Sequence, residues 1–164
     1  MWRPLRYILL TLVCSSGALL VALAGRGAGQ EMVAQSQVEA AQPDLVIERL
    51  IVNPPFPTPN EAVTITVVVK NVGAAFGWSE FHTDLYLDPP QQPPTITTPS
   101  TAANRWFLGL PAGGSFSWSS TQHFTSAGCG HMIYAWVDRD NAVTEADETN
   151  NVTSMPVCVE TDPY

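Results

Sequence analysis

Apolar and polar residues alternate along several short segments of the chain, a pattern typical of half-buried β-strands. Residues 61–71 show it most clearly, with threonines on one face and four β-branched apolar residues on the other: Val63, Ile65, Val67 and Val69. Beyond residue 45, no window shows a sustained apolar repeat of three and four residues. The pattern therefore favours strands over helices.

Six more segments have the length and composition of strands, and turns rich in Pro and Gly separate them. They are residues 44–52, 81–88, 105–108, 115–124, 131–137 and 152–159. The segment 89–104 contains five prolines among many Thr and Ser. We predict that it is a long loop and the part of the domain best placed to vary or to bind.

Seven strands in a hundred-odd residues are typical of an immunoglobulin-like domain. We therefore predict an all-β fold, a seven-stranded antiparallel immunoglobulin-like β-sandwich. In residues 81–88 the alternation places His82, Asp84 and Tyr86 on one face and Leu85 and Leu87 on the other, and in each strand a slip of one residue would exchange the buried set. The predicted core consists of Val46 or Ile47 with Val63, Ile65, Val67, Leu85, Leu87, Phe116, Trp118, Ile133 and Val137.

Residues 138–151 join the last two predicted strands and carry five acids against one base. This stretch is the long turn of a hairpin, and Cys129 and Cys158 bracket it. In an antiparallel hairpin, the residue numbers of opposed residues always add to the same total. If the two cysteines are opposed, the turn is centred between Val143 and Thr144. We therefore expect the cysteines to lie opposite each other, close enough for a disulfide.

Residues 1–24 have the features of a secretory signal peptide: two early arginines, an apolar stretch and a small-x-small cleavage site at residues 22–24. An uncleaved anchor helix is the alternative, and it is the only membrane contact that we expect. Residues 25–42, rich in Gly, Ala and Gln, are predicted to be a flexible leader before a domain at residues 43–160. We expect a secreted or cell-surface protein. Cleavage would remove Cys14 and leave an even pair, for which export favours a disulfide over two buried thiols.

The formal net charge is −8 and the isoelectric point is about 4.6. This excess of acid argues against nucleic acid and anionic membrane surfaces as partners, because both attract clusters of Lys and Arg.

Five segments together closely resemble the CARDB domain, a cell-adhesion-related domain of bacterial and archaeal surface proteins. They are residues 43–47, 60–73, 84–88, 109–114 and 137–151. The last is the most specific, with Asp-x-x-Asn followed by Glu-x-Asp-Glu-x-Asn-Asn. The resemblance covers about residues 43–160 and implies a seven-stranded sandwich, an extracellular role in adhesion or protein contact, and no catalytic residues. The long Pro-rich loop and the cysteine pair depart from the family pattern.

The acidic turn is the first candidate site, because its oxygen ligands suit calcium. The candidate ligands are Asp138, Asp140, Asn141, Glu145, Asp147 and Glu148. Their spacing does not match the helix–loop–helix calcium loop, since the glycine is missing. The alternative is structural, because Asp and Asn form local backbone hydrogen bonds in turns.

Trp106, beside the Pro-rich loop, and Tyr86 are the candidate binding residues, whereas Trp118 is expected in the core. The three histidines, His82, His123 and His131, are irregularly spaced, and we interpret them as ordinary surface residues rather than a zinc set. The chain has no Gly-x-Ser-x-Gly motif and no evident nucleophile–base set, so we expect no catalysis.

These observations favour an exported, non-catalytic immunoglobulin-like module for adhesion or for binding a protein or glycan ligand at the cell surface. A structural spacer or stalk domain without a specific ligand is the main alternative. An enzyme-associated accessory or inhibitor domain is a more distant one. No cofactor is expected, apart from the calcium considered above.

Overall fold

The computed structural model describes residues 12–13, 19–20, 40–100 and 102–161, and every regular element in these residues is a β-strand. The chain divides into two units, residues 1–38 and residues 39–164. In the first unit, β1 (Leu12–Val13) and β2 (Leu19–Leu20) form a short antiparallel pair. The rest of the predicted signal peptide and nearly all of the predicted leader lie outside the described residues, so both stay predictions. No helix long and apolar enough to span a membrane occurs in the described part of the chain.

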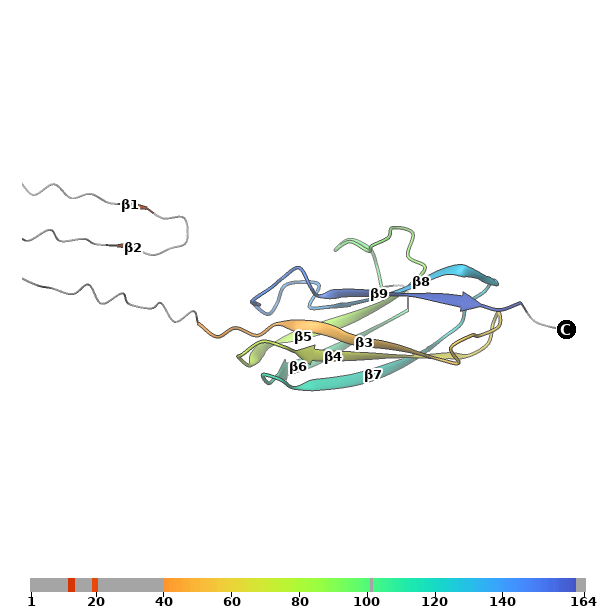
Figure 1. The fold of residues 1–164 in the computed structure, drawn as a ribbon, viewed down its shortest axis with the longest axis horizontal. Helices are drawn as coiled ribbons and strands as arrows, with labels where there is room; N and C mark the ends of the chain where they lie inside the picture. The colour runs from red at the N-terminus through yellow and green to blue at the C-terminus, as the bar shows by residue number, and fades with distance from the viewer. Residues whose placement is uncertain (1–11, 14–18, 21–39, 101, 162–164) are drawn as a thin grey trace, which may run out of the picture. The chain divides into compact units, whose positions relative to one another are not determined.

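The second unit is a sandwich of two antiparallel sheets (Figure 1). One sheet has the order β3-β4-β7 and contains β3 (Leu45–Asn53), β4 (Val63–Asn71) and β7 (Ser115–Gln122). The other has the order β6-β5-β8-β9 and contains β5 (Gly77–Leu87), β6 (Ala103–Leu110), β8 (Gly128–Val137) and β9 (Val152–Val159). The predicted seven-stranded antiparallel immunoglobulin-like sandwich is confirmed.

The alternating residues of β4 supply the centre of the core. Val63, Ile65 and Val67 are fully buried, while the threonines between them are half-buried on the outer side. Ile47 is the buried member of the pair Val46 and Ile47. Of the other predicted core residues, Leu87 and Phe116 are only partly buried against the core, and the rest are buried: Leu85, Trp118, Ile133 and Val137.

Strand β5 differs from the prediction in two ways. It begins at Gly77 instead of residue 81, because its first half also pairs with β6 across a bulge between Gly77 and Glu80 that interrupts the alternation. Both of its faces are buried from Phe81 to Tyr86. Alternation between a buried and an exposed side therefore does not describe this part of β5.

Asn71 joins four segments near one end of the sandwich. Its Oδ1 accepts hydrogen bonds from the backbone N–H groups of Asp44 and Gly73, both at 3.0 Å, and its Nδ2 donates to the carbonyls of Ala75 and Leu110. Gly73 has no room for a side chain, because a Cβ there would lie 2.4 Å from the carbonyl oxygen of Gln42. These contacts give the Asn-Val-Gly turn after β4 a structural role.

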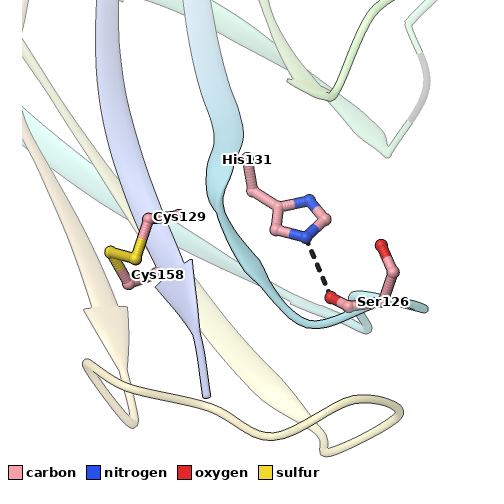
Figure 2. Close-up of a disulfide and its surroundings, with 4 residues drawn as sticks. All are labelled: Ser126, Cys129, His131 and Cys158. Atoms are coloured by element: carbon pink, nitrogen blue, oxygen red, sulfur yellow. Dashed lines mark hydrogen bonds between the residues drawn. A yellow bond between two sulfur atoms is a disulfide. The ribbon is translucent and has the colours of Figure 1, made fainter. Parts of the chain in front are cut away.

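The predicted disulfide between Cys129 and Cys158 is confirmed, and it links β8 to β9 (Figure 2). Gly128 lies opposite Val159, which is the register expected from the cysteines. A bulge before His131 then shifts the register by one residue, so that His131 lies opposite Val157. The bridge closes a separation of 29 residues.

Candidate functional site

Asp138 organises the start of the acidic turn. It adopts a left-handed backbone conformation, with φ 49°. Its carboxylate accepts hydrogen bonds from the N–H groups of Ala142 at 3.0 Å and Val143 at 2.8 Å. Burial raises the pKa of Asp138, although the two N–H donors oppose that shift. The carboxylate of Asp138 therefore closes the turn by accepting hydrogen bonds that a backbone carbonyl would otherwise accept.

Glu145 connects the acidic turn to the first strand of the sandwich. Its Oε1 accepts a hydrogen bond from the backbone N–H of Leu45 at 2.5 Å, and its Oε2 accepts one from Nδ2 of Asn151. The amide of Asn151 also donates to the carbonyl of Leu45, at 3.1 Å. Burial raises the pKa of Glu145 to about 7 despite these donors. The Glu and the final Asn of the acidic motif thus fix the turn to β3.

The other candidate calcium ligands lie nearer to solvent. Glu148 accepts a hydrogen bond from the N–H of Glu145 at 2.9 Å, and Asp147 accepts from the N–H and hydroxyl of Thr149. Asp140 and Asn141 are exposed. All five carboxylates in the candidate calcium set accept hydrogen bonds within the turn or from the backbone of β3, that of Asp140 from Nε of Arg139 at 3.5 Å.

Within the described ranges, no group of three or more His, Cys, Asp or Glu side chains is arranged to hold a metal ion. The calcium site therefore stays a prediction.

A buried polar cluster, which the sequence analysis missed, covers the outer face of β5. Asp84 is 1% exposed. Its Oδ2 lies 3.2 Å from Nε2 of His82 and 3.3 Å from Nη1 of Arg139. We call His82, Asp84, Tyr86 and Arg139 the β5 outer cluster. Burial raises the pKa of Asp84, while the charges of Arg139 and His82 oppose that shift.

Arg139 of the acidic turn covers this face of β5. Its Nη1 donates to the hydroxyl of Tyr86 at 3.1 Å and to the carbonyl of Thr98 at 3.4 Å. Thr98 belongs to the Pro-rich loop and is itself buried. One guanidinium therefore holds together a strand, the acidic turn and the loop, and this is why the polar face of β5 is buried.

Two sequence-based expectations are corrected by this cluster. Tyr86 is fully buried, so its side chain is not presented to a ligand; its hydroxyl accepts a hydrogen bond from Arg139, which also donates to the carbonyl of Thr98 in the loop. His82 is 5% exposed and is not a surface histidine, because Trp106 and two carboxylates surround it. The sequence feature that could have indicated this cluster is Arg139, the single base in the acidic stretch, because its charge needs an acidic partner such as Asp84.

His123 is exposed, as expected, and His131 is partly buried. The ring of His131 bridges two segments, with Nδ1 2.6 Å from Oδ2 of Asp88 and Nε2 2.9 Å from the carbonyl oxygen of Ser126. Figure 2 shows this ring pointing toward Ser126. The contacts assign His131 to the support of the hairpin that carries the disulfide.

Trp106 is 65% exposed, which fits its expected role as a surface residue, while Trp118 lies in the core at 8% exposure. The ring of Trp106 packs against the ring of His82, its cross-strand neighbour, with centroids 4.8 Å apart. Leu108, two residues further along β6, is 80% exposed. Trp106 is therefore an exposed aromatic side chain supported by the β5 outer cluster.

The Pro-rich loop is tied to the sheet at its second half. The hydroxyl of Ser100 donates to the carbonyls of Leu85 and Ala103, and the N–H of Thr98 donates to the carbonyl of Thr95. Ile96 is 62% exposed. The loop therefore presents one apolar side chain on an anchored backbone.

The sequence profile of the CARDB family matches residues 42–155. No curated protein matches the chain. Among solved structures, the chain resembles the CARDB domain of PF1109 from Pyrococcus furiosus, crystallised in complex with di-metal ions, at 25% identity and a TM-score of 0.57, covering 72% of this chain and 89% of that one.

Two solution structures are also similar. A domain of a putative cell surface protein from Methanosarcina acetivorans has 24% identity and a TM-score of 0.53, with 72% of this chain and 92% of that one covered. A protein from Geobacter metallireducens has 26% identity and a TM-score of 0.52, with coverage of 70% and 94%.

Proposed function

This chain belongs to the CARDB family, and on that premise we propose that it is an exported, non-catalytic binding module that acts in adhesion at the cell surface. CARDB domains are extracellular or cell-surface domains, and a disulfide suits that oxidising environment. The observation that carries the proposal is the exposed pair Trp106 and Leu108, at 65% and 80%. Large apolar side chains that stay exposed together on a folded domain mark interaction sites.

The proposed contact surface is rigid before it binds. Trp106 stands on His82, which is in turn fixed by Asp84 at 3.2 Å. A side chain that is held in place loses little conformational entropy when a ligand covers it. Aromatic residues supported in this way are frequent energetic centres of interfaces. The ligand class is a protein or glycan of the cell surface.

The β5 outer cluster supports the proposal of a non-catalytic role. His82 and Asp84 are the nearest approach to an acid–base pair, but both are buried, and Arg139 shares the same carboxylate oxygen of Asp84. The second ion-pair contact of His82 is another carboxylate, that of Asp140 at 3.7 Å. These contacts suit a supporting network under Trp106 rather than a nucleophile–base set.

We propose a structural role for the acidic turn as well. The solved domain of PF1109 was obtained in complex with di-metal ions. In the present chain, the buried carboxylates of Asp138 and Glu145 already accept two hydrogen bonds each, from N–H groups. Asp138 closes the turn and Glu145 joins it to β3, and these hydrogen bonds form without a metal ion.

The adhesion proposal is tested with beads coated with the purified protein and mixed with envelopes of the producing cells. The envelopes should retain beads that carry the wild-type protein and should release most beads that carry the Trp106→Ala variant. Phe56→Ala is the matched control, because Phe56 is 62% exposed in a loop outside the proposed surface. Equal retention by both variants, or none by the wild type, would refute the proposal and favour the spacer.

A further inference from the structure

Strand β6 is the terminal strand of the four-stranded sheet, and among the described strands it pairs only with β5. It is eight residues long, contains no proline and carries a single charge, that of Arg105. A long terminal strand presents unpaired backbone N–H and C=O groups to any extended segment of another chain. Natural proteins normally protect such an edge.

The other three terminal strands of the sandwich do carry protective features. Strand β9 contains Pro156, which cannot donate to a neighbouring strand. Strand β3 has a bulge between Ile47 and Arg49, with the exposed Glu48 and Arg49 at that point. Strand β7 is rich in serine, and its largest apolar residue, Trp118, is buried. Strand β6 has an irregularity at Gly109, beside the bulge of β5, and one exposed charge, Arg105. From Ala103 to Leu108 its register with β5 is regular, and among the described terminal strands it carries the most exposed large apolar side chains, Trp106 and Leu108.

The charges around this edge indicate the chemistry of its partner. Glu80, which lies opposite Leu108 on β5, is exposed. Asp140, beside His82, has a side chain 52% exposed. Arg139 is already paired with Asp84 and Asp140. Arg105 on β6 is exposed too, but it alternates with Trp106 and therefore belongs to the other face of the strand. On the face of Trp106 and Leu108 the exposed charges are those of Glu80 and Asp140, in a chain of formal net charge −8.

We propose that β6 binds an extended, basic segment of a partner protein, which adds to the sheet as a fifth strand beside β6. The stems of its alternate Lys or Arg side chains would cover Trp106 and Leu108 and bring the positive charge to that face, while its apolar residues would lie on the other face of the added strand. Neighbouring strands lie about 4.8 Å apart, so a long basic side chain that passes over Leu108 comes within reach of Glu80. The proposal rests on the proposed binding function and names its partner class and mode.

A second copy of this chain is a poorer occupant of the same edge. Each copy would bring a net charge of −8 and the same acidic neighbours, Glu80 and Asp140. Like charges placed across an interface suppress pairing. A basic segment gains electrostatic attraction at the place where a second copy meets repulsion.

The test uses a fluorescent ten-residue peptide of alternating lysine and valine, at a concentration where it does not associate with itself, and the purified protein. Fluorescence anisotropy should show binding to the wild-type protein, and a matched peptide of glutamate and valine should not bind. Failure of the lysine peptide to bind would overturn the proposal. So would equal binding of both peptides.

Two variants separate edge pairing from general attraction to an acidic protein. Leu108→Lys places a charge on the β6 edge and should weaken binding at least about tenfold. Ile51→Lys makes the same change of net charge on β3, where Ile51 is 43% exposed, and should leave binding within about twofold. Equal weakening by both variants would mean that the peptide senses only net charge, and the proposal would fall.

Light scattering of the wild-type protein without peptide shows whether a second copy of this chain occupies the β6 edge. We expect a monomer, and a dimer that Leu108→Lys dissociates would assign the edge to a second copy instead. The outcomes also separate this proposal from the adhesion proposal. Suppose that envelopes retain the wild-type beads but not the Trp106→Ala beads, and that the lysine peptide does not bind. The adhesion proposal would then stand, and only the proposal of a basic partner strand would be refuted.

Discussion

Nη1 of Arg139 lies 3.3 Å from Oδ2 of Asp84, a carboxylate that is 1% exposed. A charge buried to this extent is tolerated only when it is paired. This contact connects the acidic turn to the centre of β5, and His82 on the same oxygen extends it to Trp106. The stability of the sandwich and the shape of the proposed binding surface therefore depend on the same pair.

We predict that Arg139→Met destabilises the protein by about 3 kcal/mol, because the buried Asp84 loses its strongest partner. Chemical denaturation of the variant measures the change. Lys70→Met is the matched control, since it removes an exposed ion pair with Glu48 at 2.9 Å and should change stability little. Asp84→Asn combined with Arg139→Met should recover part of the loss. Equal effects of the Arg139 and Lys70 variants would contradict a special role for the buried pair.

The pH dependence of stability follows from Glu145. Burial raises its pKa from 4.5 to about 7 in the folded protein, so folding favours the protonated form. The contribution of Glu145 is therefore fully present below the unfolded value and is lost as the pH rises through about 7. The shift corresponds to roughly 3 kcal/mol. Burial also raises the pKa values of Asp84 and Asp138, which act in the same direction.

The measurement is the free energy of unfolding between pH 4.5 and pH 8. We expect a decline across this range in the wild-type protein and a flatter profile in Glu145→Gln. Glu61→Gln, at an exposed position, serves as the control and should retain the wild-type profile. A rise in wild-type stability with pH would show that the N–H donors of Leu45 and Asn151 outweigh the burial of Glu145.

The fold was predictable because its strands are defined by local alternation. Val63, Ile65 and Val67 identify their own buried face, and the two cysteines set the hairpin register to within the one-residue bulge before His131. The buried polar face of β5 was not predictable in this way. It depends on Arg139 and Thr98, which follow Asp84 at long and unrelated intervals, and no periodic pattern encodes contacts of this kind.

The acidic turn shows the same limit. Its composition indicated a turn, but the same oxygens suit calcium or backbone N–H groups equally well. The partner of Glu145 is Leu45, 100 residues earlier in the chain, and only the folded structure brings that N–H group to the carboxylate. Trp106 was identified because it lies beside a predicted loop, whereas its support by His82 requires the register between β5 and β6.

The disulfide gives a prediction about both stability and processing. Replacing Cys129 and Cys158 together by serine should cost roughly 3–4 kcal/mol, because the bridge closes a loop of 29 residues in the unfolded chain. Denaturation of the variant and of the wild-type protein measures the difference. A thiol assay under denaturant should find no free thiol in the protein isolated from the producing cells if residues 1–24 are removed, and one, from Cys14, if they are kept. Two or more thiols would contradict the bridge in solution.

Calcium should leave the melting temperature of the protein unchanged. The carboxylates of Asp138 and Glu145 are buried and already accept N–H donors, so calcium would have to replace hydrogen bonds that close the turn and hold it to β3. A site occupied at ten times its dissociation constant would add roughly 1.4 kcal/mol, a shift of several degrees that calorimetry detects easily. The protein is melted with 10 mM calcium and with chelator, beside Asp140→Asn as a variant of the exposed carboxylate. A rise with calcium that Asp140→Asn abolishes would make the turn a metal site, and its two buried carboxylates would then have to exchange their N–H partners for the ion.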